Sequence, residues 1–231
     1  MNRIQYLKQQ LSSKYCILCQ RPVREHVLCC GTLCICPECA PLMETFRPGT
    51  AFAGSGNVDS LFAAAPYRGI LRVSFLNHKF FRQEAFYEIF AGFLIRAIEP
   101  VIGQLQIDLV LPVPLSAARM RERGYNQAGL LARNLAAHFE IDYTENAVFR
   151  IRNTAKQSLL LPHERQKNVE NAFLADREKV AGKRILLIDD IFTFGATMDA
   201  CAKSLLDAGA KSVNAAVLFK TISRNDENDQ F

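Results

Sequence analysis

The sequence lacks any apolar run long enough to cross a membrane. Its longest apolar stretch, from Ile89 to Ile98, is far shorter than the roughly 20 residues that a spanning helix needs, and Arg96 interrupts it. The first ten residues also lack an apolar core followed by a small-residue cleavage site, so we expect no secretory signal. These absences predict a cytoplasmic protein without a membrane span.

Two glycine-rich motifs typical of nucleotide binding are missing as well. The chain contains neither a Gly-x-x-x-x-Gly-Lys-Ser/Thr segment nor a Gly-x-Gly-x-x-Gly segment, which disfavours ATP-binding Walker loops and dinucleotide folds.

The overall composition is that of a folded soluble chain. The 231 residues are 49% hydrophobic and 22% charged, with 12 Gly and 9 Pro, which argues against fibrous and disordered classes.

Positive charge is concentrated in one internal stretch. Over the whole chain, 28 basic residues stand against 23 acidic ones, a formal excess of five. Between Arg119 and Lys167 there are nine basic and five acidic residues, so this stretch alone carries a balance of +4. A local excess of this kind indicates a binding site for a polyanion rather than a generally basic surface.

Cysteines cluster near the start of the chain. Seven of the eight lie between Cys16 and Cys39, in a stretch too short to fold by burying a core of its own. The pairs Cys16/Cys19 and Cys36/Cys39 are each Cys-x-x-Cys, and sixteen residues separate them, the usual gap of a four-thiolate zinc module. Because a reducing cytoplasm disfavours disulfides, we expect these four thiolates to hold structural zinc. Cys34 could replace Cys36 in the ligand set.

The rest of the chain has the pattern of an α/β protein. Apolar segments of strand length alternate with segments of helical periodicity, which predicts a parallel sheet flanked by helices. The expected strands are 59–66, 107–113, 184–190 and 212–219, and the expected helices are 69–80, 84–98, 126–139 and 197–208. The run from Ile185 to Ile188 is the clearest strand and is expected at the centre of the sheet.

These features divide the chain into three predicted segments. Residues 1–45 form the zinc-binding four-cysteine module, and residues 46–222 form the α/β domain. The stretch 45–57, which contains Pro48 and three glycines, is interpreted as the connector between them. Residues 223–231 are polar and without periodicity, which predicts a loose tail.

A strand-to-helix turn from Asp189 to Thr197 carries the main functional prediction. Exposed N–H groups at a helix start attract a phosphate, Gly195 permits close approach of the backbone, and the Thr193 and Thr197 hydroxyls can donate hydrogen bonds. Asp189 and Asp190 end a buried strand, where carboxylates can accept hydrogen bonds from ribose hydroxyls. The turn therefore predicts a site for a ribose 5-phosphate. Two adjacent acids would be more than a simple helix cap needs.

This turn resembles the signature of type I phosphoribosyltransferases, in which two acidic residues precede a Thr-rich, Gly-containing phosphate loop. Over nearly its whole length the chain resembles the ComF competence family. The motifs that carry this likeness are the two Cys-x-x-Cys pairs and residues 67–69, 79–80, 112–116, 123–127, 154–168 and 189–190. The resemblance implies a type I phosphoribosyltransferase-like fold, a parallel sheet flanked by helices, with a small N-terminal zinc-binding module.

The resemblance also implies a ligand, phosphoribosyl pyrophosphate or a related nucleotide, bound together with Mg²⁺. It implies that Asp189 and Asp190 hold the ribose and are the catalytic residues. The 5-phosphate would be bound by Thr193, Phe194, Gly195, Ala196 and Thr197. Residues 112–116, with Pro114, Leu115 and Ser116, would form the pyrophosphate-side loop, and Arg119 and Arg123 just beyond it would face the pyrophosphate. Basic residues from Lys156 to Lys167 would lie in a hood over the pyrophosphate.

Two residues depart from the pattern of these enzymes. Phe194 stands where a threonine or small residue is usual, which removes a hydroxyl but no backbone donor. Thr193 stands where some relatives carry a carboxylate general base, and a hydroxyl cannot abstract a proton well at neutral pH.

Three functions follow as alternatives. The first is a phosphoribosyltransferase of unknown acceptor that acts in natural competence and DNA uptake. The second is a protein that handles single-stranded DNA together with competence proteins and keeps a vestigial, non-catalytic phosphoribosyl pocket. The third is a structural protein with a vestigial pocket.

Overall fold

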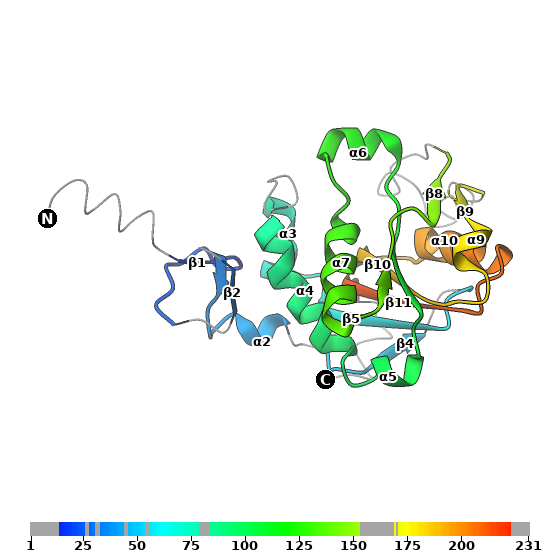
Figure 1. The fold of residues 1–231 in the computed structure, drawn as a ribbon. Helices are drawn as coiled ribbons and strands as arrows, with labels where there is room; N and C mark the ends of the chain where they lie inside the picture. The colour runs from blue at the N-terminus through cyan, green and yellow to red at the C-terminus, as the bar shows by residue number, and fades with distance from the viewer. Residues whose placement is uncertain are drawn as a thin grey trace, which may run out of the picture.

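The computed structural model describes residues 14–25, 28–30, 33–43, 46–53, 56–78, 84–152, 169 and 171–222. A six-stranded sheet forms its centre, in the order β4-β5-β11-β10-β6-β7 (Figure 1). All neighbouring strands are parallel except β4, which pairs antiparallel with β5 at one edge. These strands are β4 (Ala51–Ala53), β5 (Ser60–Pro66), β6 (Leu109–Pro112), β7 (Asp142–Tyr143), β10 (Arg184–Phe192) and β11 (Ser212–Lys220).

Helices cover the sheet and connect its strands. They are α2 (Ala40–Met43), α3 (Gly69–His78), α4 (Glu84–Ile98), α5 (Ile102–Leu105), α6 (Ala117–Arg123), α7 (Gln127–Phe139), α9 (Arg177–Val180) and α10 (Ala196–Asp207). The four strands expected from the sequence are confirmed as β5, β6, β10 and β11, and the four expected helices as α3, α4, α7 and α10. The sequence therefore predicted most of the α/β framework.

Strand β10 separates two hydrophobic clusters because side chains along a strand alternate between its faces. Leu186 and Ile188 belong to the cluster that contains the buried residues of α4 and α7. Ile185 and Leu187 belong to the cluster that contains the buried residues of α10. Strand β10 is thus the central strand expected from its apolar run, and it is covered on both faces.

The cysteine-rich segment forms a three-stranded sheet in the order β1-β3-β2. Its strands are β1 (Tyr15–Cys16), β2 (Leu28–Cys30) and β3 (Leu33–Ile35), and it lies beside α3 in Figure 1. Ile17 and Leu18 are buried in the same cluster as Phe75 of α3, and the Ser74 hydroxyl donates a hydrogen bond to the Ile17 carbonyl. The module thus shares a core with the α/β domain, which compensates for the apolar residues it lacks.

Two features of the middle of the chain were not predicted. Strand β4 lies inside the stretch 45–57, which was interpreted as a connector and in which no strand was predicted. A separate two-stranded sheet pairs β8 (Val148–Arg150) with β9 (Phe173–Ala175), and Phe149 faces Leu174 across it. The predicted hood and the polar tail at 223–231 fall outside the described residues. Among the described helices, none is both long and apolar enough to cross a membrane.

Candidate functional site

Strands β6 and β10 are neighbouring parallel strands, and the connections that follow them lead to opposite faces of the sheet. After β6 the chain enters α6 and α7, and α7 packs on the face of the sheet that also carries α4. After β10 the chain enters α10, which packs on the opposite face. In open α/β sheets, ligands bind outside the carboxyl ends of the strands at such a switch point. This places the candidate site between the loop that follows β6 and the loop that follows β10.

The two acidic residues near the end of β10 lie on opposite faces of the strand. Continuing the alternation of β10, Asp189 falls on the side of α10 and Asp190 on the side of α4. Their electrostatic neighbours agree: Asp189 acts on the pKa of Cys201 in α10, and Asp190 acts on the pKa of Tyr87 in α4. Both carboxylates are half-buried, so they border the site from both sides of the strand and are not sealed in the core.

The loop after β10 presents a helix start without a side-chain cap. Gly195 is the N-cap of α10 with a φ of 77°, a left-handed conformation that favours glycine. The first intrahelical bond of α10 runs from the Asp199 N–H to the Gly195 carbonyl at 2.8 Å. The amides of Ala196 and Thr197 lie in the first turn of α10, ahead of that bond, where helix N–H groups point out of the helix start. They form the donor set expected for a phosphate.

This loop is held in place by Thr221, which directly follows β11 and which the sequence did not single out. The Thr221 N–H donates to the Phe192 carbonyl at 2.9 Å, and its hydroxyl lies 3.2 Å from the Thr193 carbonyl oxygen. Beyond these anchors Thr193 is exposed, and 62% of the Phe194 side chain is exposed. The loop is therefore anchored at its base and open to solvent at its tip.

The loop after β6 begins beside the acidic pair. Pro112 is in register with Ile188, and the Val113 N–H donates to the Ile188 carbonyl at 2.8 Å. Pro114 and Leu115 are half-buried. Ser116 is buried and caps α6, since its hydroxyl accepts from the Arg119 N–H at 3.3 Å. The structure thus brings the predicted pyrophosphate-side loop next to the predicted ribose-binding carboxylates.

Three arginines surround these loops, and one of them was not predicted. Arg119 lies in the first turn of α6, beyond the Ser116 cap. Arg123 ends α6, and its guanidinium donates to the Gln127 side chain at 2.9 Å. Arg150 ends β8; burial and then the nearby Arg119 lower its pKa, while Asp189 opposes that change. An isolated Arg at the end of a three-residue strand gave no periodic signal in the sequence, and only the fold brings Arg150 near Arg119 and Asp189.

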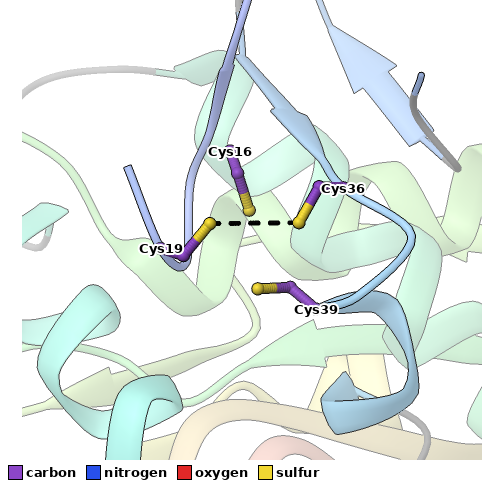
Figure 2. Close-up of side chains that lie close together, drawn as sticks. All are labelled: Cys16, Cys19, Cys36 and Cys39. Atoms are coloured by element: carbon purple, nitrogen blue, oxygen red, sulfur yellow. Dashed lines mark hydrogen bonds between the residues drawn. The ribbon is translucent and has the colours of Figure 1, made fainter. Parts of the chain in front are cut away.

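The four predicted zinc ligands converge although sixteen residues separate the two pairs. The sulfur atoms of Cys16, Cys19, Cys36 and Cys39 all lie within 4.8 Å of one another, and they point toward a common centre (Figure 2). The Cys19 and Cys36 sulfurs are 3.9 Å apart, close to the roughly 3.8 Å between ligands of a tetrahedral Zn–S₄ centre with bonds of about 2.3 Å. The cluster can therefore bind a metal ion such as zinc.

Comparison with known proteins agrees with this arrangement. Residues 121–230 match the family model described as a phosphoribosyl transferase domain. The DNA utilization protein YhgH of Salmonella typhimurium is 28% identical over 212 residues, 90% of each chain. Competence protein ComFC of Bacillus subtilis is 28% identical over 92% of this chain and 80% of its own. Competence protein F of Haemophilus influenzae is 33% identical over 46% of this chain and 47% of its own.

The names of these relatives, together with the phosphoribosyl transferase domain match, support the resemblance of the chain to the ComF family. Its α/β part has the type I phosphoribosyltransferase-like fold expected from the sequence. Among solved structures, glutamine phosphoribosylpyrophosphate amidotransferase from B. subtilis, complexed with ADP and GMP, overlaps this chain with a TM-score of 0.38 and 21% identity. That overlap covers 58% of this chain and 26% of the amidotransferase.

The candidate metal cluster consists of the two Cys-x-x-Cys pairs themselves. Cys34, the alternative ligand, is bonded in a disulfide and is not part of the four-sulfur group. Burial raises the pKa of the Cys19 thiol, but hydrogen bonds from the backbone and side chain of Arg21 outweigh it and lower the pKa to about 6. The Arg21 Nε lies 3.4 Å from the Cys19 sulfur. Because metals bind thiolates, Arg21 favours the form of Cys19 that acts as a ligand.

A cavity of about 780 Å³ lies between α10 and β9. Two of its acidic groups are already paired. Asp199 accepts from the Asn57 side chain at 2.9 Å, and Asp207 forms an ion pair with Lys203 at 2.7 Å. Ala196, at the start of α10, lines the cavity, whereas neither carboxylate of the acidic pair does, so the cavity adjoins the loop after β10 and not the acidic pair.

Proposed function

We propose that this protein, which resembles the ComF family, binds phosphoribosyl pyrophosphate, or a related 5-phosphoribosyl ligand, with Mg²⁺ and acts in the cytoplasm in natural competence and DNA uptake. The observation that carries the proposal is the switch point between β6 and β10, where half-buried carboxylates run into the uncapped start of α10. The names of its relatives, competence protein and DNA utilization protein, support the cellular role.

In the proposed complex the ligand lies across the carboxyl ends of β10 and β6. The 5-phosphate accepts hydrogen bonds from the loop between Thr193 and Thr197, since first-turn amides and a helix dipole both favour an anion. Asp189 and Asp190 accept from the ribose hydroxyls on either side of the strand. The pyrophosphate lies along the loop from Pro112 to Ser116, and its negative charge is matched by nearby arginines.

Arginine is suited to this role because it stays protonated and can bind two phosphate oxygens at once. Arg119 and Arg150 are close enough for Arg119 to help lower the pKa of Arg150. Bringing two positive groups together costs electrostatic free energy, and an anion bound close to both of them would offset that cost. We therefore add Arg150 to the proposed pyrophosphate contacts.

The site is also compatible with phosphoribosyl transfer to an acceptor. In that reaction the bond between the anomeric carbon and pyrophosphate breaks, pyrophosphate leaves with the electron pair, and a bond to the acceptor forms. Mg²⁺, which proteins hold through one or two carboxylates and substrate phosphates, would stabilise the charge of the leaving group when bound. Thr193 cannot act as a general base, so the proposal favours an acceptor that attacks through its own lone pair, such as an amine.

Binding and turnover are tested separately. Titration calorimetry should detect phosphoribosyl pyrophosphate with Mg²⁺, and ribose 5-phosphate alone, while ATP and NAD should not bind comparably. Failure to bind either phosphoribosyl compound would refute the proposed ligand. Incubation with phosphoribosyl pyrophosphate, Mg²⁺ and a panel of amine and base acceptors should release pyrophosphate above background with at least one acceptor. Binding without release from the whole panel would favour a pocket that is not catalytic.

A second candidate function, handling of single-stranded DNA, is favoured by the surface near β8. Phe149 is 44% exposed, and the exposed residues Ile151 and Arg152 follow it along the chain. Exposed aromatic rings stack on bases, and basic side chains contact phosphates. Gel-shift binding of single-stranded DNA that weakens with salt, and that Asp189→Asn leaves unchanged, would support this function with a vestigial pocket. Absent or salt-insensitive binding would count against it.

A further inference from the structure

A cluster of buried polar atoms lies beside the loop that follows β6. It is formed by the connection from α6 to α7, together with Tyr87 of α4, whose ring lies edge-on to the Tyr125 ring at a centroid distance of 5.8 Å. Within the described part of the chain, five buried side-chain atoms of this cluster have no hydrogen-bond partner: Tyr87 Oη, Arg123 Nε, Tyr125 Oη, Asn126 Oδ1 and Gln127 Nε2. Buried polar groups are costly and are rarely retained without a role.

Asn126 has the contact that connects this cluster to the candidate site. It is the N-cap of α7, yet its side chain makes no capping bond to the helix. Its amide instead donates to the Val113 carbonyl at 3.0 Å, and the residue is 8% exposed. An asparagine at this position normally stabilises a helix by accepting from its first turn. Here the side chain contacts the neighbouring loop instead.

The Asn126 bond fixes the orientation of one peptide group in that loop. The Val113 N–H already donates to the Ile188 carbonyl on β10 at 2.8 Å. With its carbonyl bound by Asn126, both backbone groups of Val113 are held, one by β10 and one by the start of α7. The next residue, Pro114, has a fixed φ and no N–H. The path of the chain from Val113 to Ser116 is therefore set largely by these two bonds.

We propose that Asn126 is a positioning residue for the pyrophosphate-side loop: by holding the Val113 carbonyl, it keeps residues 113–116 in the conformation that receives the pyrophosphate of the ligand. This inference rests on the proposed phosphoribosyl function and deepens it. Asn126 itself touches neither the ribose nor the 5-phosphate, because its contact is to the loop after β6 and not to the loop after β10. Loss of the Asn126 side chain should therefore weaken binding of the pyrophosphate and leave binding of the ribose 5-phosphate unchanged.

The test compares Asn126→Ser with Asn134→Ser. Serine still serves as an N-cap, but its side chain is too short to reach the Val113 carbonyl. Asn134 is a matched control, since it lies in the same helix and its amide also donates to a backbone carbonyl, that of Leu130, at 2.8 Å. Binding of Mg²⁺-pyrophosphate and of ribose 5-phosphate is measured separately by titration calorimetry on the full chain.

We expect Asn126→Ser to weaken Mg²⁺-pyrophosphate binding about tenfold, the effect of roughly one hydrogen bond, and to leave ribose 5-phosphate binding unchanged. Asn134→Ser should leave both unchanged. Equal binding of pyrophosphate by wild type and Asn126→Ser, or equal weakening of both ligands in that variant, would overturn the inference. If wild type binds neither ligand, the proposed function fails and the inference with it.

A second variant keeps the test decisive if Asn126→Ser does not fold. Asn126→Asp has the same shape and caps helices equally well, but it has no donor for the Val113 carbonyl. Its added charge would repel pyrophosphate, and that effect would fade in high salt. We expect the selective loss of pyrophosphate binding to persist in high salt. Full recovery of binding in salt would show that charge alone was responsible and would overturn the positioning role.

Discussion

Asp189 and Asp190 are adjacent in the sequence, yet their carboxylates lie on opposite faces of β10. Asp189 lies on the side of α10, with Arg150 and Cys201 as electrostatic neighbours. Asp190 lies on the side of α4, with Tyr67 and Tyr87 as neighbours. A ligand at the end of this strand can therefore be contacted from two sides, by groups that belong to different packing layers.

Both acidic residues should be needed for ribose binding, and we predict that Asp189→Asn and Asp190→Asn each weaken ribose 5-phosphate binding by about 10- to 100-fold, the value of a hydrogen bond to a charged group. Calorimetry on each variant measures this change in affinity.

The positions of Asp189 and Asp190 on opposite faces of β10 can be tested separately through the pKa of Tyr67. Burial raises the pKa of Tyr67, and Asp190 raises it further, so Asp190→Asn should lower that pKa and Asp189→Asn should not. NMR titration of labelled tyrosine would show an equal shift in both variants if the faces were assigned wrongly.

The left-handed conformation of Gly195 should be required for phosphate binding. Gly195→Ala places a side chain at a φ of 77°, which should destabilise the fold by about 1 kcal/mol and remove ribose 5-phosphate binding. Gly182→Ala is the matched control, because Gly182 has a similar φ of 74° with nothing within 4 Å of the added Cβ. Both variants should unfold more easily in urea, but Gly182→Ala should bind ribose 5-phosphate like wild type. Normal binding by Gly195→Ala would contradict the proposed phosphate loop.

The metal cluster should hold zinc and support the docking of the cysteine module. We predict that Cys39→Ser abolishes zinc binding, measured by elemental analysis, and lowers the unfolding midpoint, because Ile17 and Leu18 are buried against the α/β domain. Cys34→Ser should keep its full zinc content, since Cys34 lies outside the four-sulfur group. Loss of zinc from Cys34→Ser with retention in Cys36→Ser would mean that the ligand set is different. Chelation of wild type should reproduce the effect of Cys39→Ser.

The pair of Asp108 and Arg184 should make stability depend on pH without affecting ligand binding. Arg184 donates to Asp108 through Nη2 at 2.7 Å and Nε at 2.8 Å, which holds the pKa of Asp108 well below its usual range. A lowered carboxyl pKa contributes stability that is present above the unfolded pKa of about 4 and is lost as the pH falls through the folded value. Asp108→Asn should therefore lower the thermal midpoint at pH 7, and this difference should shrink below about pH 4.

Asp207→Asn is the control for that pair. Asp207 forms an exposed ion pair with Lys203, with side chains 64% and 60% exposed, and exposed pairs contribute little. The thermal midpoint of Asp207→Asn should match that of wild type both at pH 7 and below about pH 4. A difference between wild type and Asp108→Asn that stays constant from pH 7 to pH 3 would show that the carboxylate charge is not the cause.

Much of the framework was predictable because apolar periodicity reports which residues must be buried. The helix expected at 84–98 is α4 with the same bounds, and the run from Ile185 to Ile188 is the centre of the central strand. Strand β4 and the sheet of β8 and β9 were missed because strands of three residues are too short to show a period. Their pairing depends on neighbours that are distant in the sequence.

Local sequence by itself determined the two chemical motifs: the spacing of four cysteines predicted the metal cluster, and the strand, two acids, glycine and helix predicted the phosphate loop. Only the tertiary structure decided that Asp189 and Asp190 face different layers, that Arg150 lies near Arg119, and that Asn126 holds the loop after β6. The physical reason is how far apart along the chain the interacting residues lie. Thiolate spacing and helix starts are properties of a few consecutive residues, whereas these contacts require segments that come together when the sheet and its helices pack.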